Sequence, residues 1–176
     1  MNLLVVVDMQ NDFLTGTLAN KDAVAIIPNV LKEIENFKDS VIIATRDTHG
    51  ENYLETSEGK NLPVTHCIVN TWGWQVEENI QKAIENNTLK SFINKNSFGL
   101  YEWQEALAYS VKFTKFDEIE LIGVCTDICV VSNALILKAL YPETRIVVKA
   151  DCCAGTTKEN HEAALQTMRS CQIEVI

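Results

Sequence analysis

The sequence predicts a single doubly wound α/β domain, residues 1–176, in which helices cover both faces of a six-stranded, mostly parallel sheet. Three observations predict this three-layer, Rossmann-like arrangement. The chain has 176 residues, which is close to one ordinary domain, and 47% of them are hydrophobic, enough for one sizeable core. Short apolar runs alternate with segments of helical spacing, a pattern typical of parallel strands joined by right-handed crossovers. No internal repeat, low-complexity tract or linker interrupts this alternation.

Six apolar, β-branched runs are expected to form the strands, because continuous runs of this length suit strands that are buried on both faces. The first run, LLVVV, ends at an aspartate, and the third run is the weakest of the six. In chain order the predicted strands span residues 3–7, 41–44, 88–93, 119–122, 145–148 and 173–176.

Five segments between these runs carry apolar residues at helical spacing, so each should turn one face toward the sheet. One long connection, from residue 46 to about residue 74, carries two of the three histidines, and loops of that length in compact domains tend to be functional. The predicted helix faces are Val24, Ile27, Val30, Leu31 and Ile34; Val76, Ile80, Ala83 and Ile84; Leu100, Trp103, Leu107 and Val111; Val131, Ala134, Leu135 and Lys138, whose stem can pack; and Ala163, Ala164, Thr167 and Met168.

Composition excludes several classes of partner. The formal net charge is −9 and no basic stripe is present, which argues against nucleic acid and against anionic membranes. No window approaches the roughly 20 apolar residues that a membrane-spanning helix needs, and the N-terminal apolar run is too short for a signal peptide. We therefore expect a cytoplasmic protein whose six cysteines are thiols. They contain no CxxC pair, which argues against a zinc site built from four cysteines.

Polar and reactive residues follow the predicted strands at the points where these end. In open α/β sheets the binding crevice lies beyond the carboxyl ends of the strands, so these side chains should gather at one edge of the sheet. In chain order they are Asp8, then Arg46, Asp47 and His49, then Lys95, then Cys125 and Cys129, and finally Asp151, Cys152 and Cys153.

Cys129 is a candidate nucleophile because it falls in the first turn of a helix predicted to begin near Asp127. The unpaired N–H groups and the dipole of a helix N-terminus favour a thiolate, and the same N–H groups can bind an oxyanion. A nucleophilic thiol also needs a base and positive charge, which Asp8 and Lys95 can supply. Plainer alternatives stay open: a buried thiol that fills space, a turn-capping aspartate and a solvated lysine. Cys125 is more readily structural, acting through its backbone N–H.

The long connection holds a candidate metal site. Asp47 and His49 stand two residues apart, and His66 follows with Glu55 and Glu58 between. Two histidines with carboxylates suit Zn²⁺, Fe²⁺ or Mn²⁺. The alternative is a surface loop with scattered polar residues. The third histidine, His161, is expected at the exposed start of the last helix, without a role.

Five motifs in order resemble the isochorismatase-like cysteine hydrolases. They are VVVDMQNDF at the first strand, TRDTH after the second, HCIVNTWGW in the long connection, NKNSF after the third strand and GVCTDICV after the fourth. Their order and spacing match over essentially the whole chain. The Asp-x-His pair and the later His-Cys pair resemble the nicotinamidase branch, whereas isochorismatases and N-carbamoylsarcosine amidases generally lack this metal set.

The resemblance implies a catalytic triad of Asp8, Lys95 and Cys129. It implies an oxyanion hole formed by the backbone N–H groups of Cys125 and Cys129, with a cis peptide between Val124 and Cys125. It also implies that Phe13 stacks on the substrate ring. The implied metal, zinc or else iron or manganese, would be held by Asp47, His49 and His66, with Glu58 as the best match for a fourth ligand.

The implied activity is metal-dependent hydrolysis of nicotinamide to nicotinate and ammonia, a step of NAD salvage, through a cysteine thioester. Such enzymes take a small-molecule amide, and oligomers are common among them, so a homo-oligomer is expected. The alternatives are another amidase of the superfamily acting on a carbamoyl, ureido or other small amide, and a non-catalytic α/β binding module. The chain departs from the branch at Leu62, where tryptophan is frequent, and Trp72, Trp74 and Tyr101 are the aromatic residues considered as replacements.

Overall fold

The sheet is the organising element of the fold. A computed structural model describes residues 1–112 and 115–176, and its six strands form one sheet in the order β3-β2-β1-β4-β5-β6. Every strand pair in it is parallel, so the predicted mostly parallel sheet is entirely parallel among the described residues. The strands are β1 (Asn2–Val7), β2 (Val41–Asp47), β3 (Lys90–Lys95), β4 (Glu118–Val124), β5 (Arg145–Ala154) and β6 (Glu174–Val175).

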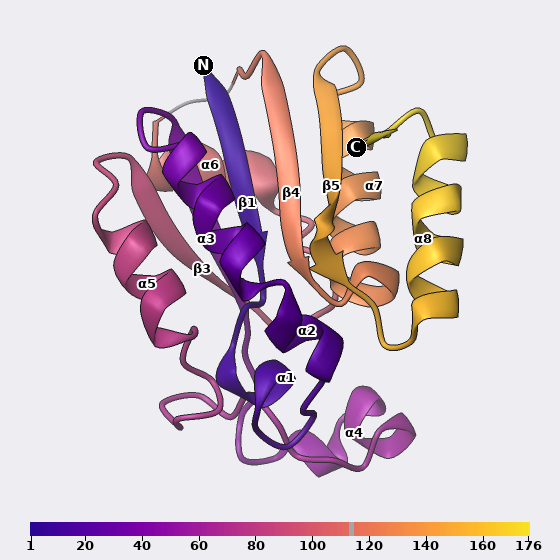
Figure 1. The fold of residues 1–176 in the computed structure, drawn as a ribbon. Helices are drawn as coiled ribbons and strands as arrows, with labels where there is room; N and C mark the ends of the chain where they lie inside the picture. The colour runs from indigo at the N-terminus through magenta and orange to yellow at the C-terminus, as the bar shows by residue number, and fades with distance from the viewer. Residues whose placement is uncertain (113–114) are drawn as a thin grey trace.

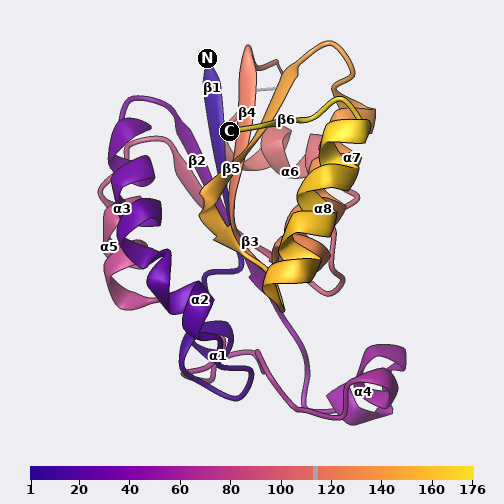
Figure 2. The same ribbon diagram turned by 45° about the vertical axis from the view of Figure 1, so that its right-hand side comes forward.

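Helices cover both faces of the sheet, which confirms the predicted three-layer α/β class. On one face pack α2 (Lys21–Ala25), α3 (Ile27–Asn36) and α5 (Glu78–Glu85). On the other pack α6 (Trp103–Ser110), α7 (Val131–Leu140) and α8 (Lys158–Ser170), and Figures 1 and 2 show the two layers. The short helices α1 (Asn11–Leu14) and α4 (Ser57–Asn61) lie beyond the carboxyl ends of the strands. Among the described residues, no helix is long and apolar enough to cross a membrane.

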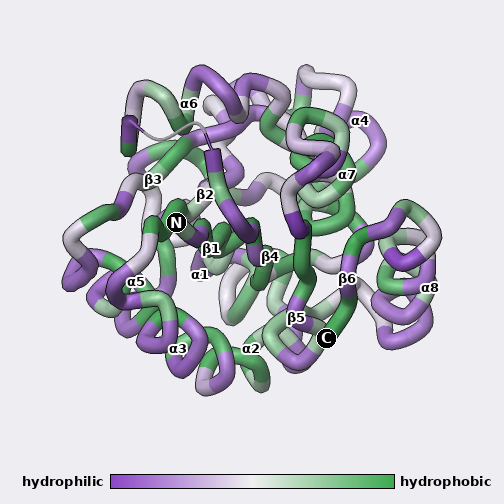
Figure 3. The backbone as a smooth tube through the Cα atoms, turned by 90° about the horizontal axis from the view of Figure 1, so that it is seen from above, coloured by the Kyte–Doolittle hydropathy of each residue, from purple (hydrophilic) through white to green (hydrophobic). Residues whose placement is uncertain are grey.

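The core consists of two layers because successive strand residues point to opposite faces. Leu3, Val5 and Val7 pack under α6, α7 and α8, whereas Leu4 and Val6 pack under α2, α3 and α5. All five are essentially inaccessible to solvent, as expected for a central strand. In Figure 3 the hydrophobic stretches follow the central strands, and hydrophilic stretches lie on the outer sides of the helices.

Several expected elements differ in extent. The helix predicted around residues 24–34 is two helices, because Pro28 lies at the start of α3 and cannot donate a backbone hydrogen bond to the preceding turn. As a result Val24 is exposed on α2. In α8 the predicted face was wrong in part: Ala163 and Thr167 are exposed, and Leu165 is buried instead. Strand β5 continues six residues beyond its last predicted position, because Cys153 and Ala154 still pair with β4 across a register shift.

Candidate active site

Asp8, Lys95 and Cys129 meet at the carboxyl ends of β1, β3 and β4. Asp8 is fully buried and accepts a hydrogen bond from Thr45 Oγ1 at 2.7 Å. Lys95 Nζ lies 2.6 Å from Asp8 Oδ2 and 3.6 Å from Cys129 Sγ. The structure therefore brings together the three residues that the sequence singled out for the triad.

A glycine allows this close approach of β1 and β4. Gly123 has a φ of +117°, and a Cβ atom there would lie 2.1 Å from the carbonyl oxygen of Val7. A side chain at this position would push the end of β4 away from β1. Val7 immediately precedes Asp8, and Gly123 stands two residues before Cys125, so both sides of the site would move. The geometry of the site thus depends on the absence of a side chain at residue 123.

Protonation in the site differs from the expectation that a helix N-terminus favours the thiolate. Burial raises the pKa of Cys129 well above its ordinary value, the Asp8 carboxylate raises it further, and Lys95 only partly opposes them. Burial also raises the pKa of Asp8, against the effect of Lys95. Burial lowers the pKa of Lys95, but the combined attraction of Asp8, Cys129 and Asp47 outweighs it, so the pKa is raised. In the absence of substrate, Cys129 is therefore a thiol beside an ion pair.

The segment that carries Cys129 begins with a wide turn. Thr126–Val130 form a π-helical turn, η2, and α7 follows directly, so a helical segment begins close to the predicted start near Asp127 and Cys129 lies in its first turn. The carbonyl oxygen of Cys125 accepts hydrogen bonds from the backbone N–H groups of Ile128 and Val130. The peptide between Val124 and Cys125 is cis, as the resemblance implied.

Two contacts from the segment after β5 fix this turn, and sequence reasoning missed both. Thr126 is fully buried, and its Oγ1 lies 2.8 Å from Nδ1 of His161 on α8. Asp127 accepts hydrogen bonds from the backbone N–H and the hydroxyl of Thr156, at 2.8 and 2.5 Å. The expectation of an exposed, idle His161 was wrong, because the first turn of α8 packs directly against η2 and leaves the imidazole half-buried.

Asn133 also holds the segment around Cys129 in place, and sequence reasoning did not predict it. Its side chain donates to the carbonyl oxygen of Cys129 at 2.8 Å and to that of Phe98 at 3.1 Å. Its Oδ1 accepts from the backbone N–H of Leu100 and from Trp103 Nε1. One fully buried amide thus ties the segment that carries Cys129 to the connection after β3.

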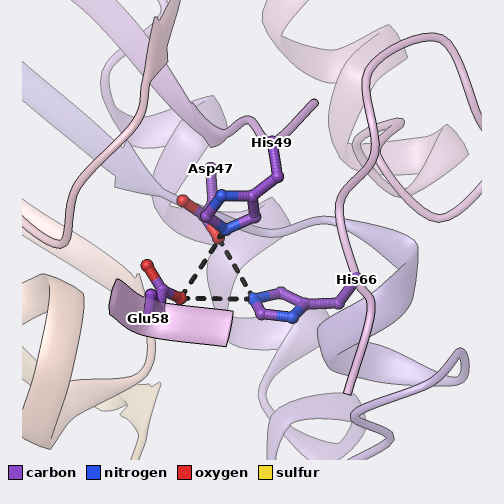
Figure 4. A group of neighbouring side chains, drawn as sticks. All are labelled: Asp47, His49, Glu58 and His66. Atoms are coloured by element: carbon purple, nitrogen blue, oxygen red, sulfur yellow. Dashed lines mark hydrogen bonds and ion pairs between the residues drawn. The ribbon is translucent and has the colours of Figure 1, made fainter. Parts of the chain in front are cut away.

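The four predicted metal ligands converge, as Figure 4 shows. Asp47, His49, Glu58 and His66 each offer one ligand atom, and these atoms lie within 4.8 Å of one another. Asp47 Oδ2 is 2.9 Å from His49 Nε2 and 3.4 Å from His66 Nε2. Glu58 Oε1 is 3.6 Å from the first of these nitrogens and 3.7 Å from the second. Glu55 is exposed on the neighbouring 3₁₀ turn, η1 (Tyr53–Glu55), and is not part of the cluster.

Neighbouring groups hold the ligands in place. His66 donates from Nδ1 to the carbonyl oxygen of Val64 at 2.7 Å, which leaves Nε2 as the atom facing the cluster. Gln10 brackets the backbone of Asp47, accepting from its N–H at 2.7 Å and donating to its carbonyl oxygen at 2.8 Å. Asp12 accepts from the backbone N–H of Cys67 at 2.8 Å, next to His66. Such supporting contacts orient metal ligands and tune their affinity.

A cavity of about 480 Å³ joins the two groups of residues. Cys125 and Cys129 line it on one side, and Asp47, Glu58 and His66 line it on the other. Phe13 also lines it, and its ring centroid is 5.7 Å from that of His66.

None of the three aromatic residues considered as replacements at the position of Leu62 lines the cavity. Trp72 lines a separate surface pocket, Tyr101 is 71% exposed beside another, and Trp74 packs against the guanidinium of Arg46. Phe98 does line the cavity. The hydrogen bond from Asn133 to its carbonyl oxygen holds its backbone in place.

Known proteins resemble this chain over its whole length. A family model described as the isochorismatase domain matches residues 2–176. A nicotinamidase/pyrazinamidase of Mycobacterium tuberculosis is 26% identical over 191 residues, covering 100% of this chain and 98% of the relative. A nicotinamidase of Schizosaccharomyces pombe is 26% identical, covering 98% and 91%. The crystal structure of a pyrazinamidase of Pyrococcus horikoshii in complex with zinc superposes with a TM-score of 0.79 at 28% identity, covering 99% and 98%. These findings confirm the resemblance that the five motifs indicated.

Proposed function

This chain belongs to the isochorismatase family, in its nicotinamidase-like branch, and we propose that it is a metal-dependent nicotinamidase. The reaction would convert nicotinamide and water to nicotinate and ammonia through a thioester on Cys129. One observation carries the proposal: the Asp8–Lys95–Cys129 group and the Asp47–His49–Glu58–His66 cluster open into the same cavity. Lys95 lies between them, with Nζ 3.8 Å from Asp47 Oδ1.

The donor set fits a divalent transition metal. A tetrahedral zinc site with bonds of about 2.0–2.1 Å places its ligand atoms roughly 3.4 Å apart. The four separations between histidine nitrogens and carboxylate oxygens run from 2.9 to 3.7 Å, around that value. Two imidazoles and two carboxylates also suit Fe²⁺ and Mn²⁺. Asp47, His49, Glu58 and His66 would hold the metal, which would supply a Lewis acid that orients the ring nitrogen of the substrate.

The triad residues account for the bond changes. Asp8 accepts the Cys129 thiol proton, and Lys95 stabilises the charges that develop beside it. The Cys129 sulfur attacks the amide carbon, while the N–H groups of Cys125 and Cys129 bind the oxyanion. Asp8 then gives its proton to the leaving ammonia, which leaves an acyl thioester. A water molecule, deprotonated by Asp8, hydrolyses that thioester and returns the thiol.

The test is ammonia release from nicotinamide by the purified protein, before and after chelation and zinc readdition. We expect release that chelation abolishes and zinc restores. Cys129→Ala should abolish turnover with an unchanged thermal transition, whereas Cys171→Ala, at an exposed cysteine, should retain it. Retained turnover in folded Cys129→Ala would refute the mechanism. Normal metal content in His49→Ala would refute the assignment of the cluster, and activity without metal would favour a metal-independent amidase.

A further inference from the structure

The cavity that holds Cys129 is larger than a single-ring amide needs. Its volume of about 480 Å³ falls in the range of roughly 300–1,000 Å³ typical of sites for drug-sized ligands. A pyridine carboxamide is much smaller than such a ligand. Space therefore remains in the cavity when the ring lies between the cysteine and the metal cluster.

The cavity also continues into a second groove. A groove of about 830 Å³ shares Glu58, Leu62, Phe98 and Ile128 with it as lining residues. Leu62 and Phe98 are 39% and 46% exposed, so the boundary between the two spaces is formed by apolar side chains open to solvent. A ligand bound at Cys129 can extend past this boundary without displacing a packed core residue.

The chemistry of the groove selects what it can take. Most of its lining residues are neutral hydrogen-bonding groups, among them Asn52, Thr56, Ser57, Asn61, Asn96 and Ser97. Among the described residues that line it, none is a lysine or an arginine, and Glu58 contributes a carboxylate. A neutral substituent with hydroxyl or ether oxygens matches this lining, whereas a carboxylate or phosphate would find no lysine or arginine among these residues to pair with.

The backbone at the boundary is fixed, so its side chains set the width of the passage. Leu62 donates its N–H to the carbonyl oxygen of Glu58 at 2.8 Å, and its own carbonyl oxygen accepts from Tyr53 Oη at 2.9 Å. The carbonyl oxygen of Phe98 accepts from Asn133. A larger side chain at residue 62 would therefore narrow the passage while the loop stays in place.

From these observations we propose that the site hydrolyses aromatic primary amides that carry a neutral, hydrogen-bonding substituent, and that Leu62 sets this selectivity. This inference rests on the proposed amidase function and specifies its substrate class. The aromatic carboxamide would lie at Cys129, and the substituent would pass Leu62 and Phe98 into the polar groove.

The probe is nicotinamide with a hydroxyethoxy group on the ring carbon meta to both the carboxamide and the ring nitrogen. We expect its kcat/KM to equal or exceed that of nicotinamide, and a carboxymethoxy analogue to be poorer. Leu62→Trp should lower the ratio of kcat/KM for the hydroxyethoxy compound to that for nicotinamide by about tenfold, the effect of losing part of a fitted contact. Leu54→Trp, an exposed leucine in the neighbouring turn that does not line either space, should leave the ratio unchanged.

The outcomes separate this inference from the proposed function. If nicotinamide is hydrolysed and the hydroxyethoxy compound is not, the substrate class is wrong and the nicotinamidase stands. If neither is hydrolysed, the proposed function fails, and calorimetric binding of both compounds to zinc-loaded Cys129→Ala protein decides the inference. Tighter binding of the hydroxyethoxy compound, weakened by Leu62→Trp, would support it; equal or weaker binding would overturn it.

Discussion

Glu120 lowers the free energy of unfolding as the pH rises, and Glu120→Gln should remove this effect. This residue of β4 is 4% exposed, and its Oε1 has no hydrogen-bond partner among the described residues. The groups that face it are Glu33 on α3 and Lys149 and Asp151 on β5, and the Lys149 ammonium lies 2.7 Å from Glu33 Oε2. Burial, and then the neighbouring charge of Glu33, raise the pKa of Glu120 to about 7, against the weaker opposing effect of Lys149.

The sign of the effect follows from proton binding. The carboxyl group titrates near 4.5 in the unfolded chain and near 7 in the folded protein. Between these values the folded state binds more protons, so the free energy of unfolding falls as the pH rises and reaches a plateau above about 7. At about 1.4 kcal/mol per pH unit, the raised pKa corresponds to a loss of about 3 kcal/mol across this window.

Urea unfolding of the parent protein and of Glu120→Gln at pH 4.5 and above pH 7 measures this loss. Subtracting the two proteins removes contributions from other acids, Asp8 among them, whose pKa is also raised. We expect the variant to gain about 3 kcal/mol relative to the parent between the two conditions. The matched control is Glu51→Gln at an exposed glutamate, which should track the parent. A variant that follows the parent at both pH values would refute the reasoning.

Two further predictions concern residues that hold the site without touching its chemistry. Gln10→Met removes both side-chain contacts to the Asp47 backbone, so metal affinity measured by chelator competition should fall about 10–100-fold, whereas exposed Gln75→Met should leave it unchanged. Thr126→Val removes the hydroxyl that contacts His161 beneath the nucleophile turn, so kcat should fall about tenfold at a constant KM, and Thr126→Ser should restore it. Unchanged affinity in the first variant, or equal kcat for Val and Ser in the second, would contradict these roles.

The fold was predictable because its central strands are unusually uniform. LLVVV in β1 has no polar position, and such a run of β-branched and aliphatic residues suits a strand that is buried on both faces. The ends of elements were less predictable. The continuation of β5 pairs with β4 only at Cys153 and Ala154, across a register shift that local patterning does not encode.

The site residues that lie at the ends of strands could be predicted from the sequence. Asp8 directly follows β1, and Asp47 and Lys95 are the last residues of β2 and β3, so the topology alone brings them to one edge. The residues that hold the turn around Cys129 in place were not predicted, because their contacts depend on packing between segments distant in the sequence. His161 and Thr126 are 35 residues apart, and nothing in either neighbourhood indicates that a helix start will press against the nucleophile turn.

The protonation of Cys129 was misjudged for a related reason, and it leads to a prediction about reactivity. A helix N-terminus favours a thiolate, but that argument omits the fully buried carboxylate beside the sulfur. Asp8 has two opposing effects on Cys129: it is the proposed proton acceptor, and its charge raises the thiol pKa. Lys95, 3.6 Å from the sulfur, lowers that pKa.

Asp8→Asn should therefore separate reactivity from turnover. The substitution keeps an oxygen that can accept from Thr45 but removes the charge, so Lys95 remains as the neighbour that stabilises the thiolate. Turnover should fall by about 10²–10⁴-fold because the proton acceptor is lost. Alkylation of Cys129 by iodoacetamide, followed by mass spectrometry of its peptide, should nevertheless be faster than in the parent at the same pH. Exposed Asp39→Asn should change neither rate. Slower alkylation in Asp8→Asn would show that the carboxylate activates the thiol in the resting protein, and that the charge balance argued for this site is wrong.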